Sequence, residues 1–142
     1  GNYVTYSPAN TAGSFSFTIQ QRRGKRLQWL LNYRDSKNHA LFRLDRRSYS
    51  RVAVVNGRNT ESAVKDLGFE TPESIEIRID VERTRIVHRI RRSGQWVTLD
   101  DWHNPAADFT AGKFGFLIPG GKFFSGADEY AISGFSFTPS SR

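Results

Sequence analysis

The sequence predicts an all-β domain, a two-layer antiparallel β-sandwich of the jelly-roll type. Apolar residues alternate with polar ones along many short segments, turn sequences separate these segments, and no long amphipathic helix stands out. The 142 residues are 37% hydrophobic and 13% aromatic, which suits a single domain over residues 1–142. Because the chain begins in strand-like sequence without a methionine, we expect a domain excised from a longer protein.

The clearest strand is 74–82, where Ile75, Ile77, Ile79 and Val81 alternate with charged residues. Successive side chains of a strand point to opposite faces, so this segment has one dry face and one wet face. The same alternation predicts strands that bury Phe15, Phe17 and Ile19; Leu27, Trp29, Leu31 and Tyr33; Ala40, Phe42 and Leu44; Ile86, His88 and Ile90; and Phe114, Phe116 and Ile118.

Turn sequences fall between these strands at the spacing of hairpins. They are Arg23-Gly24-Lys25, Asp35 to Asn38, Asn56-Gly57, Ser93-Gly94 and Gly120-Gly121. Residues 95–100 predict one more strand. The last strand, 129–139, changes register near Ser133-Gly134. This predicts a bulge that lets Tyr130 and Ile132 before it, and Phe135 and Phe137 after it, all contribute to the core. The segment 59–68 resists assignment and is either one helical turn or a loop.

The net charge of +7 and the pI near 10.1 favour acidic partners such as nucleic acid, anionic glycans or lipid headgroups. Acidic residues are interspersed with the basic ones, however, which is typical of a solvated sheet face. The absence of cysteine excludes disulfides and thiol chemistry. No apolar run is long enough to span a membrane, and no motif of a nucleic-acid-binding module is present.

Three patterns follow one another along the chain: an aromatic strand leading to a D-x-x-N hairpin, a G-x-x-G-F segment, and an acidic turn before a final aromatic strand. Their residues are Asp35 and Asn38; Gly112, Gly115 and Phe116; and Asp128, Phe135 and Phe137. Nearly the whole chain thereby resembles the concanavalin-like lectin/glucanase sandwiches, especially bacterial laminin-G-like domains grouped with 3-keto-disaccharide hydrolases and family-16-glycosidase-like proteins. The resemblance implies a fold, and function depends on the site placed on it.

Carboxylates on the 74–82 strand are the candidates for glycoside hydrolysis, which needs two acids at a defined separation. Glu76, Asp80 and Glu82 share one face, but Arg78 stands where the glycosidases that this fold resembles carry an acid. We therefore expect a face that is salt-bridged to the arginines of 85–92, and we assign no catalytic residue.

Asp35 and Asn38 lie in a predicted turn between two strands. Their oxygens suit contacts to a sugar or to calcium. The same residue types are also preferred in tight turns, where they cap the backbone, and this local role is the favoured interpretation.

An aromatic and acidic cluster follows near a predicted strand end. Trp96 and Trp102 flank Asp101, and Asn104 comes shortly after. A ring beside carboxylates and amides can hold a sugar, with the ring stacked on C–H groups and the polar groups on hydroxyls. The alternative is structural: Trp96 fills the core and Trp102 pins a loop. Trp29 is expected in the core.

Three functions remain open at this point. The first is a non-catalytic carbohydrate-binding or glycan-recognition module of a larger bacterial protein, extracellular, periplasmic or at the cell surface, with a glycan or polysaccharide as partner. The second is a glycoside or 3-keto-disaccharide hydrolase, and the third is a protein-interaction or polyanion-binding domain. We lean towards a protein that is not an enzyme and expect other domains in the same chain, but no specific nucleic-acid partner. His39, His88 and His103 lack metal-site spacing, so no metal or cofactor is expected, with calcium at the Asp35 turn as the alternative.

Overall fold

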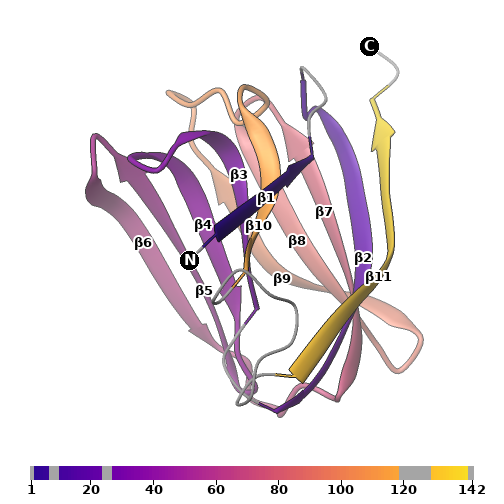
Figure 1. Cartoon of the computed structure of the whole chain (residues 1–142). Helices are drawn as coiled ribbons and strands as arrows, with labels where there is room; N and C mark the ends of the chain where they lie inside the picture. Colours follow the sequence, from indigo (N-terminus) through magenta and orange to yellow (C-terminus); the bar gives the residue numbers. More distant parts are fainter. Residues whose placement is uncertain (1, 7–9, 24–26, 119–128, 141–142) are drawn as a thin grey trace.

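The computed structural model describes residues 2–6, 10–23, 27–118 and 129–140. It confirms the predicted fold class, because the described strands form two antiparallel sheets that pack face to face as a sandwich (Figure 1). The described residues contain no helix, and therefore none long and apolar enough to cross a membrane.

The six-stranded sheet contains, in spatial order, β1 (Asn2–Tyr6), β10 (Lys113–Ile118), β3 (Leu27–Asp35), β4 (Asn38–Leu44), β5 (Ser48–Val55) and β6 (Arg58–Asp66). The five-stranded sheet contains β11 (Glu129–Pro139), β2 (Gly13–Arg23), β7 (Ser74–Glu82), β8 (Arg85–Arg92) and β9 (Gln95–His103). Strands β3 to β6 and β7 to β9 follow one another as hairpins, so the last strand of each run, β6 or β9, is an edge of its sheet.

The core between the sheets is built by the alternating residues that the sequence predicts. On β7, Ile75, Ile77, Ile79 and Val81 are buried and the residues between them face outward. The predicted inward residues that are buried on the other strands are Phe15, Phe17, Ile19, Leu27, Trp29, Leu31, Ala40, Phe42, Leu44, Ile86, His88, Ile90, Phe114 and Phe116. Trp29 is thus a core residue, as expected.

Two predicted turns have the backbone that a two-residue hairpin requires. Asn56 and Gly57 have φ angles of 52° and 79°, and Ser93 and Gly94 have φ angles of 53° and 77°. Positive φ at both central residues matches the right-handed twist of the flanking strands. The predicted bulge in β11 is also present, as a register shift between Ser133 and Ser136 against β2.

The interpretation of 59–68 as a helical turn or a loop is wrong. Residues Arg58–Asp66 form β6, which pairs with β5 along its length. Only Ala63 of this strand is half-buried, because β6 is an edge strand, and the missing burial contrast explains why the period-two pattern was hard to see.

One further expectation differs, one is confirmed, and several fall outside the described part. Tyr33 is only half-buried, since β3 changes register between Leu31 and Asp35. Ile132, Phe135 and Phe137 are partly buried against the core, as the bulge predicts. The expectations for Gly24, Lys25, Gly120, Gly121 and Asp128, and those for the side chains of Ile118 and Tyr130, lie outside what the structure describes.

Candidate functional site

A hollow of about 290 Å³ opens at one end of the sandwich, and we call it the end hollow. It lies where the β3–β4 turn, the β5–β6 turn and the 104–112 loop between β9 and β10 come together. Both sheets contribute to it, so it is an opening at the end of the core and not a groove across a sheet face.

The floor of the end hollow combines two buried rings with two alanines. Trp102 of β9 is 2% exposed and Phe109 of the loop is 4% exposed, and their ring centroids are 4.7 Å apart. Ala40 of β4 and Ala53 of β5 are cross-strand partners in the opposite sheet. Because both positions carry only a methyl group, the sheets leave unfilled a space that larger core side chains would occupy.

Charged side chains line the end hollow from three elements: Arg34 from β3, Glu61 from β6 and Asp108 from the loop. Thr110 donates to Asp108 through its hydroxyl at 2.6 Å and its backbone N–H at 3.2 Å. These hydrogen bonds, with smaller contributions from Arg83 and Arg34, lower the pKa of the Asp108 carboxyl. The hollow thus offers a guanidinium and carboxylates to a polar ligand.

The β3–β4 turn is fixed by its own side chains. Oδ1 of Asp35 accepts hydrogen bonds from the Lys37 N–H at 2.8 Å and from Nδ2 of Asn38 at 3.0 Å, and these bonds lower the pKa of the Asp35 carboxyl. Oδ1 of Asn38 accepts from the Asn56 N–H at 3.1 Å in the neighbouring turn. The local, turn-capping interpretation of Asp35 and Asn38 therefore describes what these oxygens do.

The 104–112 loop is attached to β3 through Asn32. Asn32, which has a φ of 54°, donates from Nδ2 to the carbonyls of Asp108 at 2.7 Å and Ala111 at 2.8 Å. Within the loop, Oδ1 of Asn104 accepts from the Ala106 N–H at 3.0 Å. These bonds hold the loop wall of the end hollow in place.

A buried hydrogen-bond network crosses the core between the sheets. Trp29 Nε1 donates to His88 Nε2 at 2.9 Å, and because an indole N–H can only donate, the neutral His88 ring carries its proton on Nδ1. That nitrogen is 3.4 Å from the hydroxyl of Tyr49, which donates to Asp100 Oδ2 at 2.9 Å. Burial, with a contribution from Arg51, lowers the pKa of His88 to about 3, and burial raises the pKa of Tyr49 well above 10.

Arg51 connects this network to the floor of the end hollow. Its Nε lies 2.8 Å from Asp100 Oδ2, and its guanidinium carbon lies 4.4 Å from the centre of the Trp102 ring. Three buried nitrogens, Arg51 Nε and Nη1 and Trp102 Nε1, make no hydrogen bond of good geometry with any residue that the structure describes. The orientation of Trp102 therefore depends on ring packing and on the cation–π contact.

The structure brings three of the six predicted site residues to the end hollow: Trp102, Asn104 and Asn38. Asp35 lies beside them through its bond to Asn38. Trp102 belongs to a strand and is part of the core, and its ring also packs on Phe109 of the 104–112 loop, as the structural alternative expects.

The other two predicted residues, Asp101 and Trp96, do not join the end hollow. Asp101 is next to Trp102 on β9 and so points to the opposite face, where both of its oxygens accept from Arg85 at 2.7 Å. Trp96 lies near the opposite end of β9 and is 37% exposed, so the expectation that it fills the core is wrong. Period-two alternation separates Asp101 from Trp102, whereas Trp96 is separated from Trp102 by its distance along β9 and by the register shift opposite His88 and Arg89.

Arg34 and Glu61 were missed by the sequence interpretation. Glu61 lies in the segment that could not be assigned, so no face could be given to it. Its position opposite Ala53, which faces the core, turns it inward towards the hollow. Arg34 follows the register change in β3, where simple alternation no longer tells which way a side chain points.

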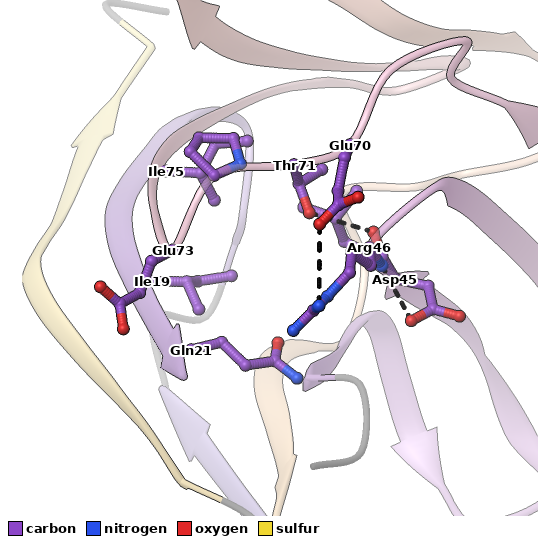
Figure 2. Close-up of a pocket in the computed structure, with 10 residues that line it drawn as sticks. Ile19, Gln21, Asp45, Arg46, Glu70, Thr71, Glu73 and Ile75 are labelled. Atoms are coloured by element: carbon purple, nitrogen blue, oxygen red, sulfur yellow. Dashed lines mark hydrogen bonds and ion pairs between the residues drawn. The ribbon is translucent and has the colours of Figure 1, made fainter. Parts of the chain in front are cut away.

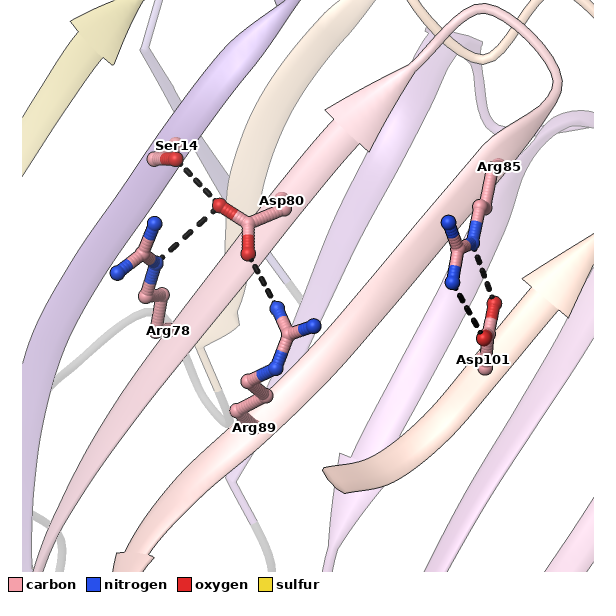
Figure 3. Close-up of polar contacts among 6 residues, drawn as sticks. All are labelled: Ser14, Arg78, Asp80, Arg85, Arg89 and Asp101. Atoms are coloured by element: carbon pink, nitrogen blue, oxygen red, sulfur yellow. Dashed lines mark hydrogen bonds and ion pairs between the residues drawn. The ribbon is translucent and has the colours of Figure 1, made fainter. Parts of the chain in front are cut away.

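The outer face of the five-stranded sheet carries paired charges, as the sequence predicts (Figure 3). Asp80 accepts hydrogen bonds from Arg78 Nε at 3.2 Å, from Arg89 Nη1 at 2.5 Å and from the hydroxyl of Ser14. Arg85 and Asp101 form a second, bidentate pair on this face (Figure 3). The negative charge of Asp80 is therefore compensated by two arginines, which disfavours a catalytic role.

A second hollow of about 310 Å³ lies at the opposite end of the sandwich. Figure 2 shows the residues that line it. Arg46 Nη1 lies 3.7 Å from Glu70 Oε1 at its rim, and its apolar part is made by Ile19, Leu44, Pro72 and Ile75. It has no aromatic lining residue among those described, and it holds none of the predicted site residues. The end hollow is therefore the better candidate site.

Among residues 2–6, 10–23, 27–118 and 129–140, no group of three or more His, Asp or Glu side chains is placed to hold a metal ion. The calcium alternative at Asp35 stays an untested expectation.

Comparison with solved structures identifies the fold. The carbohydrate-binding module CBM66 from Bacillus subtilis matches with a TM-score of 0.68 and 14% identity, over 94% of this chain and 78% of that chain. CG-16, a homodimeric agglutinin from chicken liver, matches with a TM-score of 0.63 and 10% identity, over 96% and 100%. The GH43 BlXynB protein from Bacillus licheniformis matches with a TM-score of 0.63 and 12% identity, over 94% of this chain and 28% of that chain.

Identities this low establish a shared β-sandwich fold and nothing finer. No family model matches the sequence, and no curated protein matches it. The narrower resemblance to laminin-G-like and 3-keto-disaccharide hydrolase domains stays a prediction.

Proposed function

We propose that this chain is a carbohydrate-binding domain that holds a sugar in the end hollow. The observation that carries the proposal is the convergence of Trp102, Asn104 and Asn38, from three separate segments, on one hollow that Arg34 and Glu61 also line. Aromatic and apolar walls with a few convergent polar groups are the usual construction of a small-ligand site. The carbohydrate-binding module and the agglutinin with the same fold support the glycan class.

The size of the hollow limits what it takes. At about 290 Å³ it is just below the range of roughly 300–1,000 Å³ for ligand pockets. It therefore suits one or two sugar units better than a long stretch of chain. Because Trp102 is almost completely buried, hydrogen bonds from the rim would provide most of the selectivity.

In this proposal the domain binds a sugar and does not hydrolyse it. Glycoside hydrolysis needs one carboxyl that stays protonated to act as the acid. The lowered pKa of Asp108 favours its ionised form, so this residue is poorly suited to be that acid. Asp80, the central carboxylate of the sheet face, is bound to two arginines instead.

The test is a glycan array with neutral and acidic oligosaccharides at physiological salt, followed by calorimetric titration of the strongest hit. Glu61→Gln and Arg34→Gln are expected to weaken binding about tenfold each, because each removes a charged hydrogen-bonding group. Glu76→Gln and Arg78→Gln make the same charge changes on the outer face and should leave affinity unchanged. Absence of any bound glycan, or equal loss in both sets of variants, would overturn the proposal.

A further inference from the structure

The β8–β9 hairpin projects from the sandwich as an exposed unit. Every residue from Arg91 to Thr98 is exposed, in contrast to the buried alternation in the rest of β8 and β9. Trp96 is 37% exposed and Val97 is 38% exposed, and they are two of the four large apolar residues exposed in the described part of the chain.

Two arginines of this hairpin lie over aromatic rings. The guanidinium carbon of Arg91 is 5.6 Å from the centre of the Trp96 ring, and that of Arg92 is 3.7 Å from the centre of the Phe69 ring. Such contacts orient a guanidinium but leave its N–H groups able to donate to an anion. The two cations are thus held in place, Arg91 next to the exposed ring of Trp96 and Arg92 next to the half-buried ring of Phe69.

These arginines differ from the others on the same sheet. Arg78 and Arg89 are paired with Asp80, and Arg85 is paired with Asp101 (Figure 3). Within the part of the chain that the structure describes, neither Arg91 nor Arg92 takes part in an ion pair. The positive charge of the sheet is therefore left uncompensated at the hairpin.

We propose that the β8–β9 hairpin is a second binding site, which takes an acidic polysaccharide carrying carboxylate or sulfate groups. The Trp96 ring would stack on the C–H face of a pyranose, and the guanidinium of its cross-strand partner Arg91 would bind the acidic substituent of that unit. Arg92 points to the other face of the hairpin, over Phe69, so it would bind an acidic group of a further unit of the polymer. Trp96 and Trp102 are six residues apart on β9, which is about 20 Å along a strand. The hairpin and the end hollow are therefore separate sites, and the second does not depend on the first.

The geometry favours an acidic glycan over nucleic acid. On a uronic or sulfated sugar the acidic group is attached to the ring that stacks, so one unit meets both the Trp96 ring and the guanidinium above it. In a nucleotide the base that stacks and the phosphate are separated by the ribose, and the described face offers one exposed indole rather than a row of rings for successive bases.

Heparin, a sulfated uronic polysaccharide, is the probe. We expect the protein to bind immobilised heparin, and the double variant Arg91→Gln/Arg92→Gln to lose at least about tenfold in affinity. Trp96→Ala should weaken binding without a change in charge. The matched control is Arg78→Gln/Arg85→Gln, which removes two positive charges that are already paired. Its affinity should change little.

Three results would overturn the inference: no retention on heparin, equal weakening in the two double variants, or single-stranded DNA of equal charge displacing heparin at lower concentration than heparin itself. Equal weakening would mean that net charge alone binds the polymer. Because Arg91→Gln/Arg92→Gln leaves the end hollow intact, its binding of the neutral array ligand reports separately on the proposed function.

Discussion

The guanidinium of Arg51 lies over the indole ring of Trp102, with 4.4 Å between the guanidinium carbon and the ring centre. The two residues belong to different sheets, so this contact spans the interior of the sandwich. Arg51 is also paired with Asp100, two residues before Trp102 on β9. The floor of the end hollow is thus positioned by a strand of the opposite sheet.

Arg51→Met tests this arrangement, because methionine keeps much of the apolar volume and removes the charge. Asp100 would retain its bond from Tyr49 but lose its cation, and a largely buried carboxylate would be left uncompensated. We expect the free energy of unfolding to fall by about 2–4 kcal/mol in urea titrations. Adding Asp100→Asn should recover part of this loss. Unchanged stability of the single variant would show that the pair contributes little.

His88 predicts a pH dependence of stability. Its pKa is lowered from 6.5 to about 3 in the folded state, so the unfolded chain binds a proton that the folded chain does not. The stability from this residue is complete above about pH 6.5 and decreases as the pH falls towards 3, with a loss of roughly 2 kcal/mol at pH 5. Urea unfolding between pH 8 and pH 5, as approximate limits, measures it.

The control for the pH prediction is His103→Gln, which removes an exposed histidine of β9. This variant should keep the full pH dependence between about pH 7 and pH 5, whereas His88→Gln should lose most of it, whatever its absolute stability. A wild-type protein equally stable at both pH values would contradict the buried, neutral state of His88.

The fold could be predicted from the sequence because burial on both sides of the sandwich is periodic. Ile75 to Val81 show this directly: one face of the strand meets the core and the other meets water, so the alternation is visible in the residue types. On the edge strand β6 nearly all residues are exposed, Val64 among them, so buried and exposed positions do not alternate and the period-two pattern is absent from the sequence.

The candidate site could be predicted only in part, because it depends on register. Trp102 and Asn104 were found from their residue types, but Asp101 was included with them although adjacent residues of a strand face opposite ways. Ala40 and Ala53 create the space, and only the pairing of β4 with β5 places them together. Neither residue type carries a functional signal of its own.

Gly112 lies where the loop wall of the end hollow meets the backbone of β3, and it gives a further prediction. Its φ is 79°, and a Cβ atom there would lie 2.7 Å from the carbonyl carbon of Asn32, the residue that anchors the loop. Gly112→Ala is expected to cost about 2–4 kcal/mol in thermal or urea unfolding and to weaken glycan binding, because the loop wall must move.

Gly94→Ala is the matched control for that change. Gly94 has nearly the same φ, 77°, but nothing lies within 4 Å of the position that a Cβ would take. It should cost only about 1 kcal/mol, from backbone strain alone, with glycan binding in the end hollow unchanged. Equal costs for the two variants would mean that the close approach of Gly112 to β3 is not tight.

The most direct measurement for the proposed site is an NMR titration that follows the three indole N–H signals of the chain while the array ligand is added. Trp102 lines the end hollow, whereas Trp29 is buried in the core away from it and Trp96 lies near the other end of β9. Saturation should therefore shift the Trp102 signal and leave those of Trp29 and Trp96 nearly unchanged. If the glycan binds and the Trp102 signal stays in place while Trp96 moves, the sugar is not in the end hollow.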